Sequence, residues 1–134
     1  MSGKGTFQPD SDVHITYEDQ QKINKFARLN AKWEDLKEET KNKENDLKNL
    51  EEACDEIALL DDDEKIPYLV GEVFIYQNKD TTEQCLEDAK KSTENEISDL
   101  KSQAGKVKDL MDDLKSHLYG KFGSHINLEA DDEE

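Results

Sequence analysis

The stretch IPYLVGEVFIY, residues 66–76, contains a single charged residue in a chain of 134 residues of which 39% are charged. Its centre, Gly71-Glu72, has the Gly-X form of a two-residue type II′ turn, the kind that joins the strands of a β-hairpin. Most residues on both sides of this turn are strong strand formers. The turn sets the strand register, with the predicted pairs Val70–Val73, Leu69–Phe74, Tyr68–Ile75 and Pro67–Tyr76.

Both faces of this predicted hairpin are apolar, whereas a hairpin with one face in water would alternate apolar and polar residues. An isolated hairpin is marginally stable in water and has unpaired edges. We therefore expect the hairpin to contribute strands to a sheet or barrel shared with other subunits. The alternative is a hairpin folded onto its own helix ends, with one apolar face left in water. The predicted oligomerisation residues are Pro67, Tyr68, Leu69, Val70, Gly71, Val73, Phe74, Ile75 and Tyr76.

The sequences on either side of the hairpin have the seven-residue repeat of a coiled coil. Residues 16–60 carry an apolar residue or cysteine at eight of ten a and d positions, counted from Phe26 at position a, and residues 80–120 match this count. Two such repeats indicate coiled-coil helices rather than the disordered chain that a hydrophobic content of 33% suggests. The hydroxyl of Thr16 is predicted to cap the first helix, and Asp80 to begin a capping box at the second.

The segment between the two helices is too short to run back along either of them. The helices must therefore be antiparallel, and residues whose numbers sum to about 141 face each other. This pairing brings residues 13–17 alongside residues 122–128. The predicted fold class is mainly α, a long antiparallel two-helix coiled coil with a single β-hairpin between the helices. The predicted segments are a flexible N-terminal arm (1–15), a coiled-coil hairpin domain (16–128) with its first helix at 16–60, hairpin at 66–77 and second helix at 80–120, and an acidic tail (129–134).

Charge and composition exclude several classes of partner. The formal net charge of -16, from 18 Lys and Arg against 34 Asp and Glu, argues against nucleic acid or an anionic membrane as a partner. No apolar run approaches the roughly 18 residues of a membrane span, and the N-terminus lacks the apolar core of a signal peptide. Cys54 and Cys85 have the spacing of neither a zinc site nor a disulfide framework. We therefore expect a reducing compartment, the cytosol or the nucleus.

Residues that could support enzyme chemistry are present but not grouped. The three histidines, His14, His117 and His125, show no metal-binding spacing and no nucleophile partner. No glycine-rich phosphate-binding motif occurs in the sequence. The many carboxylates fall on exposed helix faces, with no cleft that would raise a pKa. We therefore expect no enzyme activity, no bound metal and no cofactor.

Three stretches, TYEDQQKINKFARLN (16–30), the hairpin (66–76) and LYGKFGSHINLEADDEE (118–134), resemble the corresponding parts of beta-type prefoldin subunits of eukaryotes. The resemblance extends over nearly the whole chain after about residue 12. It implies a hetero-hexamer of two alpha-type and four beta-type subunits, whose hairpins close into two small barrels. It also implies ATP-independent capture of unfolded actin, tubulin and other nascent chains and their transfer to the cytosolic chaperonin. The acidic tail is then a candidate for docking on a basic chaperonin surface.

A protein that holds unfolded chains needs accessible apolar surface, and exposed apolar patches mark interaction sites. Antiparallel pairing gathers apolar residues at the open end of the helix pair. This predicted client-binding tip consists of Val13, Ile15, Tyr17, Ile23, Phe26, Leu118, Tyr119, Phe122, Ile126 and Leu128. Phe26 and Leu118 suit the end of the coiled-coil core. The better candidates for client contact are Ile15, Tyr17, Ile126 and Leu128. The alternative function is a structural adaptor, which would assemble a complex through the hairpin without binding unfolded clients.

Overall fold

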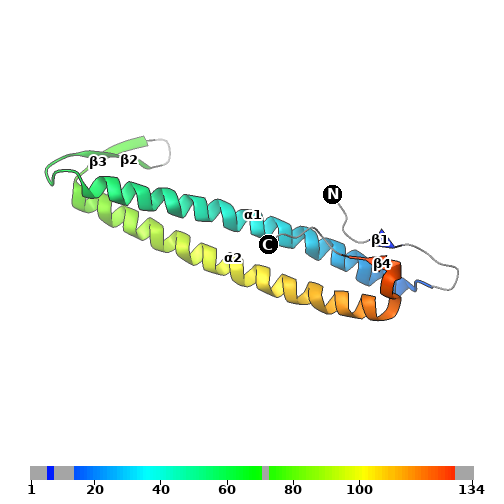
Figure 1. The fold of residues 1–134 in the computed structure, drawn as a ribbon. Coiled ribbons are helices and arrows are strands. Elements are labelled where there is room, and N and C mark those ends of the chain that lie inside the picture. Colours follow the sequence, from blue (N-terminus) through cyan, green and yellow to red (C-terminus); the bar gives the residue numbers. More distant parts are fainter. Residues whose placement is uncertain (1–5, 8–13, 71–72, 129–134) are drawn as a thin grey trace. The chain divides into compact units, whose positions relative to one another are not determined.

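The structure is a computed structural model and describes residues 6–7, 14–70 and 73–128. These residues form two long α-helices, one short 3₁₀ helix and two antiparallel sheets of two strands each (Figure 1). In chain order the elements are β1 (Thr6–Phe7), α1 (Tyr17–Ala58), β2 (Ile66–Val70), β3 (Val73–Gln77), α2 (Lys79–Phe122), η1 (Gly123–His125) and β4 (Ile126–Asn127).

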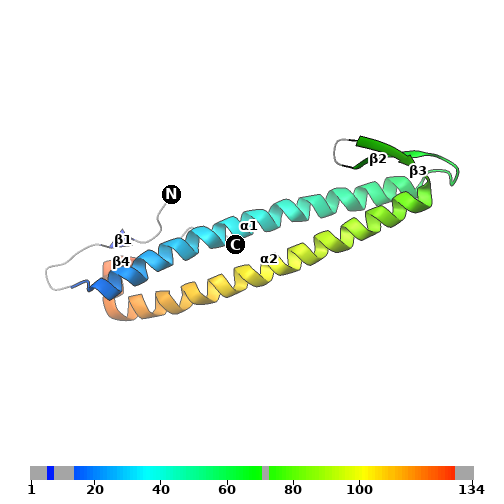
Figure 2. The ribbon, with the colours of Figure 1, turned by 180° about the vertical axis from the view of Figure 1, so that it is seen from behind.

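The chain divides into two compact units. The terminal unit consists of residues 1–38 and 101–134, and the hairpin unit consists of residues 39–100. In each unit α1 and α2 run side by side in opposite directions (Figures 1 and 2). The predicted fold class, two long helices packed together with a small antiparallel hairpin between them in the chain, is confirmed.

Contacts between the helices fix their antiparallel register. In the terminal unit the Lys121 ammonium lies 2.5 Å from the carboxylate of Asp19, and the Lys22 ammonium lies 3.2 Å from Nε2 of His117. In the hairpin unit the Lys43 ammonium lies 3.1 Å from the carboxylate of Glu96. The numbers in these pairs sum to 139 or 140. The sum predicted from the sequence, about 141, is therefore within two residues of the observed register.

Helix α1 begins with the predicted cap. The hydroxyl of Thr16 accepts a hydrogen bond from the backbone N–H of Asp19 at 3.0 Å, and the Asp19 carboxylate accepts one from the Thr16 N–H at 3.1 Å. This reciprocal pair is a capping box in which aspartate takes the place of the more usual glutamate. It satisfies two backbone N–H groups at the start of the helix, where no intrahelical acceptor exists.

The cap of α2 differs from the prediction. The side chain of Asn78, not that of Asp80, accepts the backbone N–H of Thr81 at 2.8 Å, so Asn78 is the N-cap residue. Thr82 is 1% exposed, and its hydroxyl donates to the Asn78 carbonyl at 2.9 Å. Asparagine is among the best N-cap residues because its short side chain reaches the free N–H groups of the first turn. The capping-box interpretation of Asp80 was therefore wrong.

Lys79 joins the end of α1 to the start of α2. Its ammonium donates to the backbone carbonyls of Ala58 at 3.2 Å and Leu60 at 2.9 Å, and lies 3.7 Å from the carboxylate of Asp62. The last turn of α1 contains no basic residue of its own. A cation at a helix C-terminus interacts favourably with the helix dipole and with the unpaired carbonyls. Lys79 supplies this cation from the neighbouring helix.

The β-hairpin has the predicted register. Strands β2 and β3 pair Val70 with Val73, Leu69 with Phe74, Tyr68 with Ile75 and Pro67 with Tyr76, and they add the pair Ile66–Gln77. The turn residues Gly71 and Glu72 lie outside the described residues. The pair Val70–Val73 leaves two residues between the strands, as the predicted two-residue turn requires. Every other pair of the hairpin follows from this one, so the predicted register is confirmed.

The core of the terminal unit is wider than a two-helix seam. Position e residues of α1, Ile23 and Asn30, are buried together with position a residues such as Phe26 and Trp33. After α2 the chain turns back through η1 into β4, whose Ile126 is also buried, so the core of this unit includes residues from beyond the two helices. A strict coiled-coil seam would bury only the a and d positions.

Strand β4 pairs antiparallel with β1, which places Thr6 opposite Asn127 and Phe7 opposite Ile126. Neither strand is predicted from the sequence, and the register of the helices implied a different neighbour for β4. It placed residues 13–17 alongside residues 122–128, whereas the observed partner of β4 lies several residues earlier in the chain. The heptad repeat cannot specify this pairing, because it describes only the helices.

Candidate functional site

The predicted oligomerisation hairpin has one open face. Pro67 and its cross-strand partner Tyr76 are both exposed, Tyr76 to 71%. On the opposite face, Ile66 is 7% exposed and Tyr68 is half-buried. Residues alternate between the two faces of a strand, so at the base of the hairpin one face is covered in part and the other, with Pro67 and Tyr76, is open to water.

We use the name assembly surface for the cross-strand pair Pro67 and Tyr76. Leu59 follows the last residue of α1 and is 86% exposed, the highest value among the exposed large apolar residues of the described chain. Exposed apolar residues of this size mark interaction sites when they lie near one another. No sequence pattern singles out Leu59, because it follows the last heptad position of the first helix and precedes the predicted hairpin. The backbone register places Leu69, Val70, Val73, Phe74 and Ile75 in the two strands.

The structure brings together most residues of the predicted client-binding tip, but it places them inside the terminal unit. Six are buried, with exposed fractions from 0% to 8%: Ile23, Phe26, Leu118, Phe122, Ile126 and Leu128. Ile15 and Tyr119 are half-buried, and Tyr17 is 78% exposed. Val13 lies outside the described residues. The expectation that Ile126 and Leu128 lie uncovered therefore needs correction, because η1 returns them to the helix pair.

Tyr119 holds the returning segment in place. Its hydroxyl accepts a hydrogen bond from the backbone N–H of Leu128 at 2.9 Å. The Leu128 side chain is 1% exposed, so this N–H would be costly to leave unpaired. Tyr119 thus has a positioning role in the terminal unit in addition to its predicted role at the tip.

The ion pair of Asp19 and Lys121 joins a buried carboxylate of α1 to an ammonium group of α2. The Asp19 side chain is 3% exposed, whereas that of Lys121 is 42% exposed. The hydrogen bond from Lys121 lowers the pKa of the Asp19 carboxyl from 3.8 to about 2, with further help from the Thr16 N–H and hydroxyl, and burial opposes this shift. The carboxylate is therefore fully charged at neutral pH although it is buried.

Two further buried side chains of the terminal unit, Trp33 and Asn30, have surroundings that the sequence did not predict. Trp33 is 8% exposed and lies between two ammonium groups, with Lys37 at 4.1 Å and Lys108 at 4.7 Å from its ring centroid. Such contacts are cation–π interactions. Asn30 is 2% exposed, and its Oδ1 atom has no hydrogen-bond partner within the described part of the chain. The contact of Lys37 with Trp33 has the i, i+4 spacing of one helix, whereas the Lys108 contact and the burial of Asn30 have no local sequence signal.

Within residues 14–70 and 73–128, no group of three or more His, Cys, Asp or Glu side chains is arranged to hold a metal ion. None of the helices described by the structure has the combination of length and apolar character needed to cross a membrane.

The fold defines a class of protein, an antiparallel two-helix coiled coil with a small β-hairpin between its helices in the chain. A family model described as "Prefoldin subunit" matches residues 20–125 of this chain. The chain is similar to a probable prefoldin subunit 4 of Drosophila melanogaster, with 50% identity over 126 residues that cover 94% of this chain and 91% of the relative. It is also similar to prefoldin subunit 4 of Homo sapiens, with 52% identity over 122 residues that cover 90% and 91%. The chain therefore belongs to the prefoldin family.

More distant relatives agree with this assignment. Prefoldin subunit 4 of Saccharomyces cerevisiae is 34% identical over 119 residues, which cover 89% of this chain and 92% of the relative. Among solved structures, the prefoldin beta subunit from Thermococcus strain KS-1 superposes with a TM-score of 0.74 and covers 82% of this chain and 96% of its own. Its sequence identity of 18% supports the fold alone. The resemblance found in the sequence is thus confirmed.

Proposed function

We propose that this chain is a beta-type subunit of a hetero-hexameric prefoldin co-chaperone built from two alpha-type and four beta-type subunits. The complex captures unfolded actin, tubulin and other nascent chains without ATP and transfers them to the cytosolic chaperonin. It works in the cytosol, with the nucleus as a second location. The observation that supports this proposal most strongly is the 50% identity over 94% of the chain to a probable prefoldin subunit 4.

Assembly is proposed to use the open hairpin face. Tyr76 is 71% exposed in the single chain, and its partner Pro67 is exposed beside it. Burying such side chains against a neighbouring subunit gains about 25 cal/mol for each Å² of apolar surface removed from water. Strands from neighbouring hairpins would also pair the free edges of β2 and β3, which a lone two-stranded hairpin leaves open.

Client capture is proposed to use the accessible apolar residues of the terminal unit. Tyr17 is the most exposed of the predicted tip residues, and Ile15 and Tyr119 are half-buried. The six buried tip residues hold this unit together and so shape the surface indirectly. This burial is also the observation that favours the second candidate function, a coiled-coil structural adaptor that assembles through its hairpin without binding unfolded clients.

One matched pair of variants tests both parts of the proposal in a complex reconstituted with partner subunits. Tyr76→Asp and Tyr17→Asp make the same substitution at two tyrosines of similar exposure, 71% and 78%. Tyr76→Asp should abolish hexamer formation in native mass spectrometry, because an unpaired charge would be buried in the shared sheet. Tyr17→Asp should leave the hexamer intact, since Asp is well tolerated in the first turn of a helix, and should reduce suppression of actin aggregation.

The two outcomes are independent. A hexamer that forms normally with Tyr76→Asp would contradict the assembly surface. Aggregation that is suppressed equally well by the wild-type and Tyr17→Asp complexes would remove Tyr17 from the client-binding surface. A wild-type complex that assembles but suppresses no aggregation would establish the structural adaptor instead.

A further inference from the structure

The sheet of the terminal unit is a feature that the proposed function does not use. Strand β4 follows η1, and its partner β1 comes from the opposite end of the sequence. Both strands lie outside residues 20–125, the range that the prefoldin family model matches. Each strand contributes only two residues, Thr6–Phe7 and Ile126–Asn127. The backbone of β4 is therefore paired along a very short edge.

Strand β4 is held in an extended conformation by contacts other than β1. Ile126 has φ -131° and ψ 144°, and its side chain is 4% exposed. Leu128 is 1% exposed, and its backbone N–H donates to the hydroxyl of Tyr119 on α2. Asn127, between these two anchors, is exposed. Burial on one side and the Tyr119 hydrogen bond would therefore keep β4 extended if β1 were absent.

The Tyr119 hydrogen bond also shows which backbone groups face β1. Successive N–H groups of a strand point to opposite edges, so residues of an antiparallel pair alternate between hydrogen-bonded and non-hydrogen-bonded positions. The Leu128 N–H points to Tyr119, and the N–H and C=O of Asn127 therefore point to the other edge, where Thr6 lies opposite. Without β1 this edge would offer one donor and one acceptor in the geometry of a sheet.

We propose that the β4 edge, centred on Asn127, is a strand-addition site for extended segments of unfolded clients and that β1 is its resident, displaceable occupant. The inference deepens the proposed function and rests on it. Strand addition binds main-chain groups, so it accepts segments of unrelated sequence. This property suits a terminal unit whose apolar tip residues are mostly buried, because capture then needs no opening of the core. A client and β1 compete for the same donor and acceptor.

Two proline variants of the reconstituted complex test the role of β1 and the role of β4 separately. Thr6 lies opposite Asn127 in the register, so Thr6→Pro removes the backbone N–H that β1 has at this position and should free the edge. Asn127→Pro removes the donor of β4 itself and should disable the edge for β1 and clients alike. The φ and ψ values of Ile126 lie in the region that a residue before proline adopts, and Asn127 is exposed, so this variant should fold. Thr6→Ala and Asn127→Ala keep every N–H and are the controls.

The probe is a fluorescein-labelled peptide of alternating Val and Thr with one Lys and one Glu at its ends, and binding is measured by fluorescence anisotropy. Thr6→Pro should bind the peptide roughly three- to tenfold more tightly than wild type, because a competitor that occupies most of the edge has been removed. Asn127→Pro should bind it at least about tenfold more weakly, since the added strand loses its backbone partner. The same peptide N-methylated on alternate residues should bind weakly to every variant.

Equal peptide affinity in wild type, Thr6→Pro and Asn127→Pro, or equal binding of the methylated peptide, would overturn the inference. If Asn127→Pro loses the circular-dichroism signal of the helices, the variant has not folded and Thr6→Pro provides the test. A peptide affinity of Thr6→Pro equal to that of wild type would show that β1 does not compete with the peptide. The proposed function is judged separately by the aggregation assay. A wild-type complex could suppress aggregation and yet show equal peptide affinity in all variants. That result would support client capture and contradict the role of the β4 edge in it.

Discussion

At the scale of single residues, Asp19 illustrates how a polar group can be part of a coiled-coil core. It lies seven residues before Phe26 and so occupies the same heptad position a. Its carboxylate is paired with Lys121 and accepts the Thr16 N–H, so the buried charge is compensated on two sides. Loss of one partner of a buried pair is costly, because the remaining charge stays desolvated.

We predict that Asp19→Asn destabilises the chain in a pH-dependent manner. The folded pKa of Asp19, about 2, is below the ordinary value of 3.8. Its stabilising contribution is therefore fully present above pH 3.8 and is lost as the pH falls through 2. At pH 7 the variant should unfold with a free energy lower by about 1–3 kcal/mol. Near pH 2 the difference should shrink towards zero. Urea unfolding followed by circular dichroism measures both values.

Asp109→Asn is the control, because Asp109 is an exposed aspartate of α2. Its effect should stay within about 0.5 kcal/mol at every pH. If Asp19→Asn lowers the free energy of unfolding equally at pH 7 and pH 2, the effect comes from the geometry of the cap and not from the charge of Asp19.

At the scale of elements, the end of α2 determines what the terminal unit covers. The helix ends at Phe122, and Gly123 has a φ of 57°, in the left-handed region. Glycine adopts this conformation without the steric cost that a Cβ atom adds, and for this reason it is common just after a helix. The reversal at Gly123 directs η1 and β4 back along the helix pair, where Ile126 and Leu128 become buried.

The two glycines at this end should respond oppositely to the same substitution. Gly123→Ala should destabilise the chain by about 1 kcal/mol or more, because alanine resists the positive φ. Gly120→Ala should stabilise it by about 0.5–1 kcal/mol, because Gly120 lies inside α2, where alanine is the better helix former. Apart from the adjacent residues and the backbone of the same helix, neither new Cβ atom would meet a heavy atom within 4 Å. The comparison of unfolding free energies therefore isolates the backbone, and a shift of the same sign in both variants would contradict this account.

The same elements show how far the sequence could predict the structure. The hairpin register followed from one turn and the Thr16 cap from one side chain, because both are local rules. The helices followed from the heptad repeat. Other features join residues that no local sequence pattern relates. They are the pairing of β1 with β4, the contact of Lys79 with the end of α1 and the burial of Leu128. The apolar strands of the hairpin follow from the sequence, whereas the exposure of Leu59 just after α1 does not.

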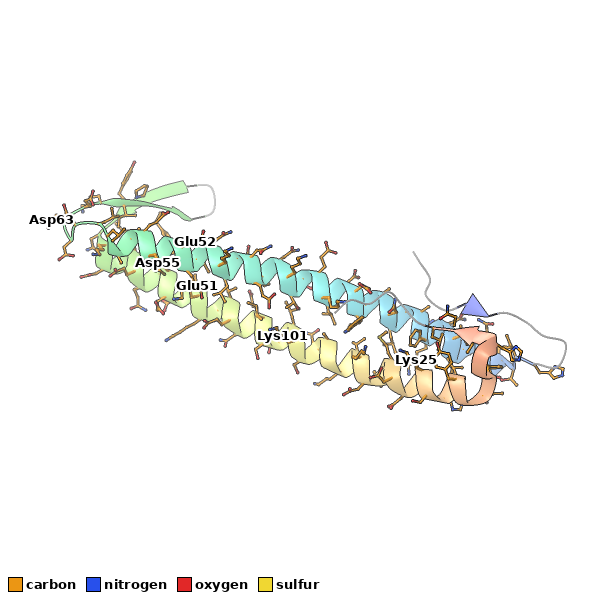
Figure 3. The ribbon with its side chains drawn as sticks, viewed as in Figure 1. Lys25, Glu51, Glu52, Asp55, Asp63 and Lys101 are labelled. Atoms are coloured by element: carbon orange, nitrogen blue, oxygen red, sulfur yellow. The ribbon has the colours of Figure 1, made fainter. Side chains whose placement is uncertain are left out.

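At the scale of the whole molecule, the net charge of -16 is unevenly distributed. Residues 51–64 contain eight acidic residues and no basic one. Figure 3 shows Glu51, Glu52 and Asp55 of this stretch on α1, and Asp63 on the loop that follows. A second acidic run, residues 129–134, contains five acidic residues and lies outside the described part of the chain. Charge of this kind keeps a protein soluble and steers it towards basic partners.

Two triple variants can distinguish a specific role of the acidic tail from the general effect of net charge. Asp131→Asn, Asp132→Asn and Glu133→Gln remove three charges from the tail, and Asp61→Asn, Asp62→Asn and Asp63→Asn remove three from the loop before the hairpin. If the tail docks on a basic chaperonin surface, only the tail variant of the reconstituted complex should bind the chaperonin more weakly. Its binding should also depend less on salt, since exposed charges are screened beyond about 8 Å at physiological ionic strength. Surface plasmon resonance over a range of salt concentrations measures both effects. Equal weakening in the two variants would indicate long-range attraction by net charge, and unchanged binding in both would exclude the tail from docking.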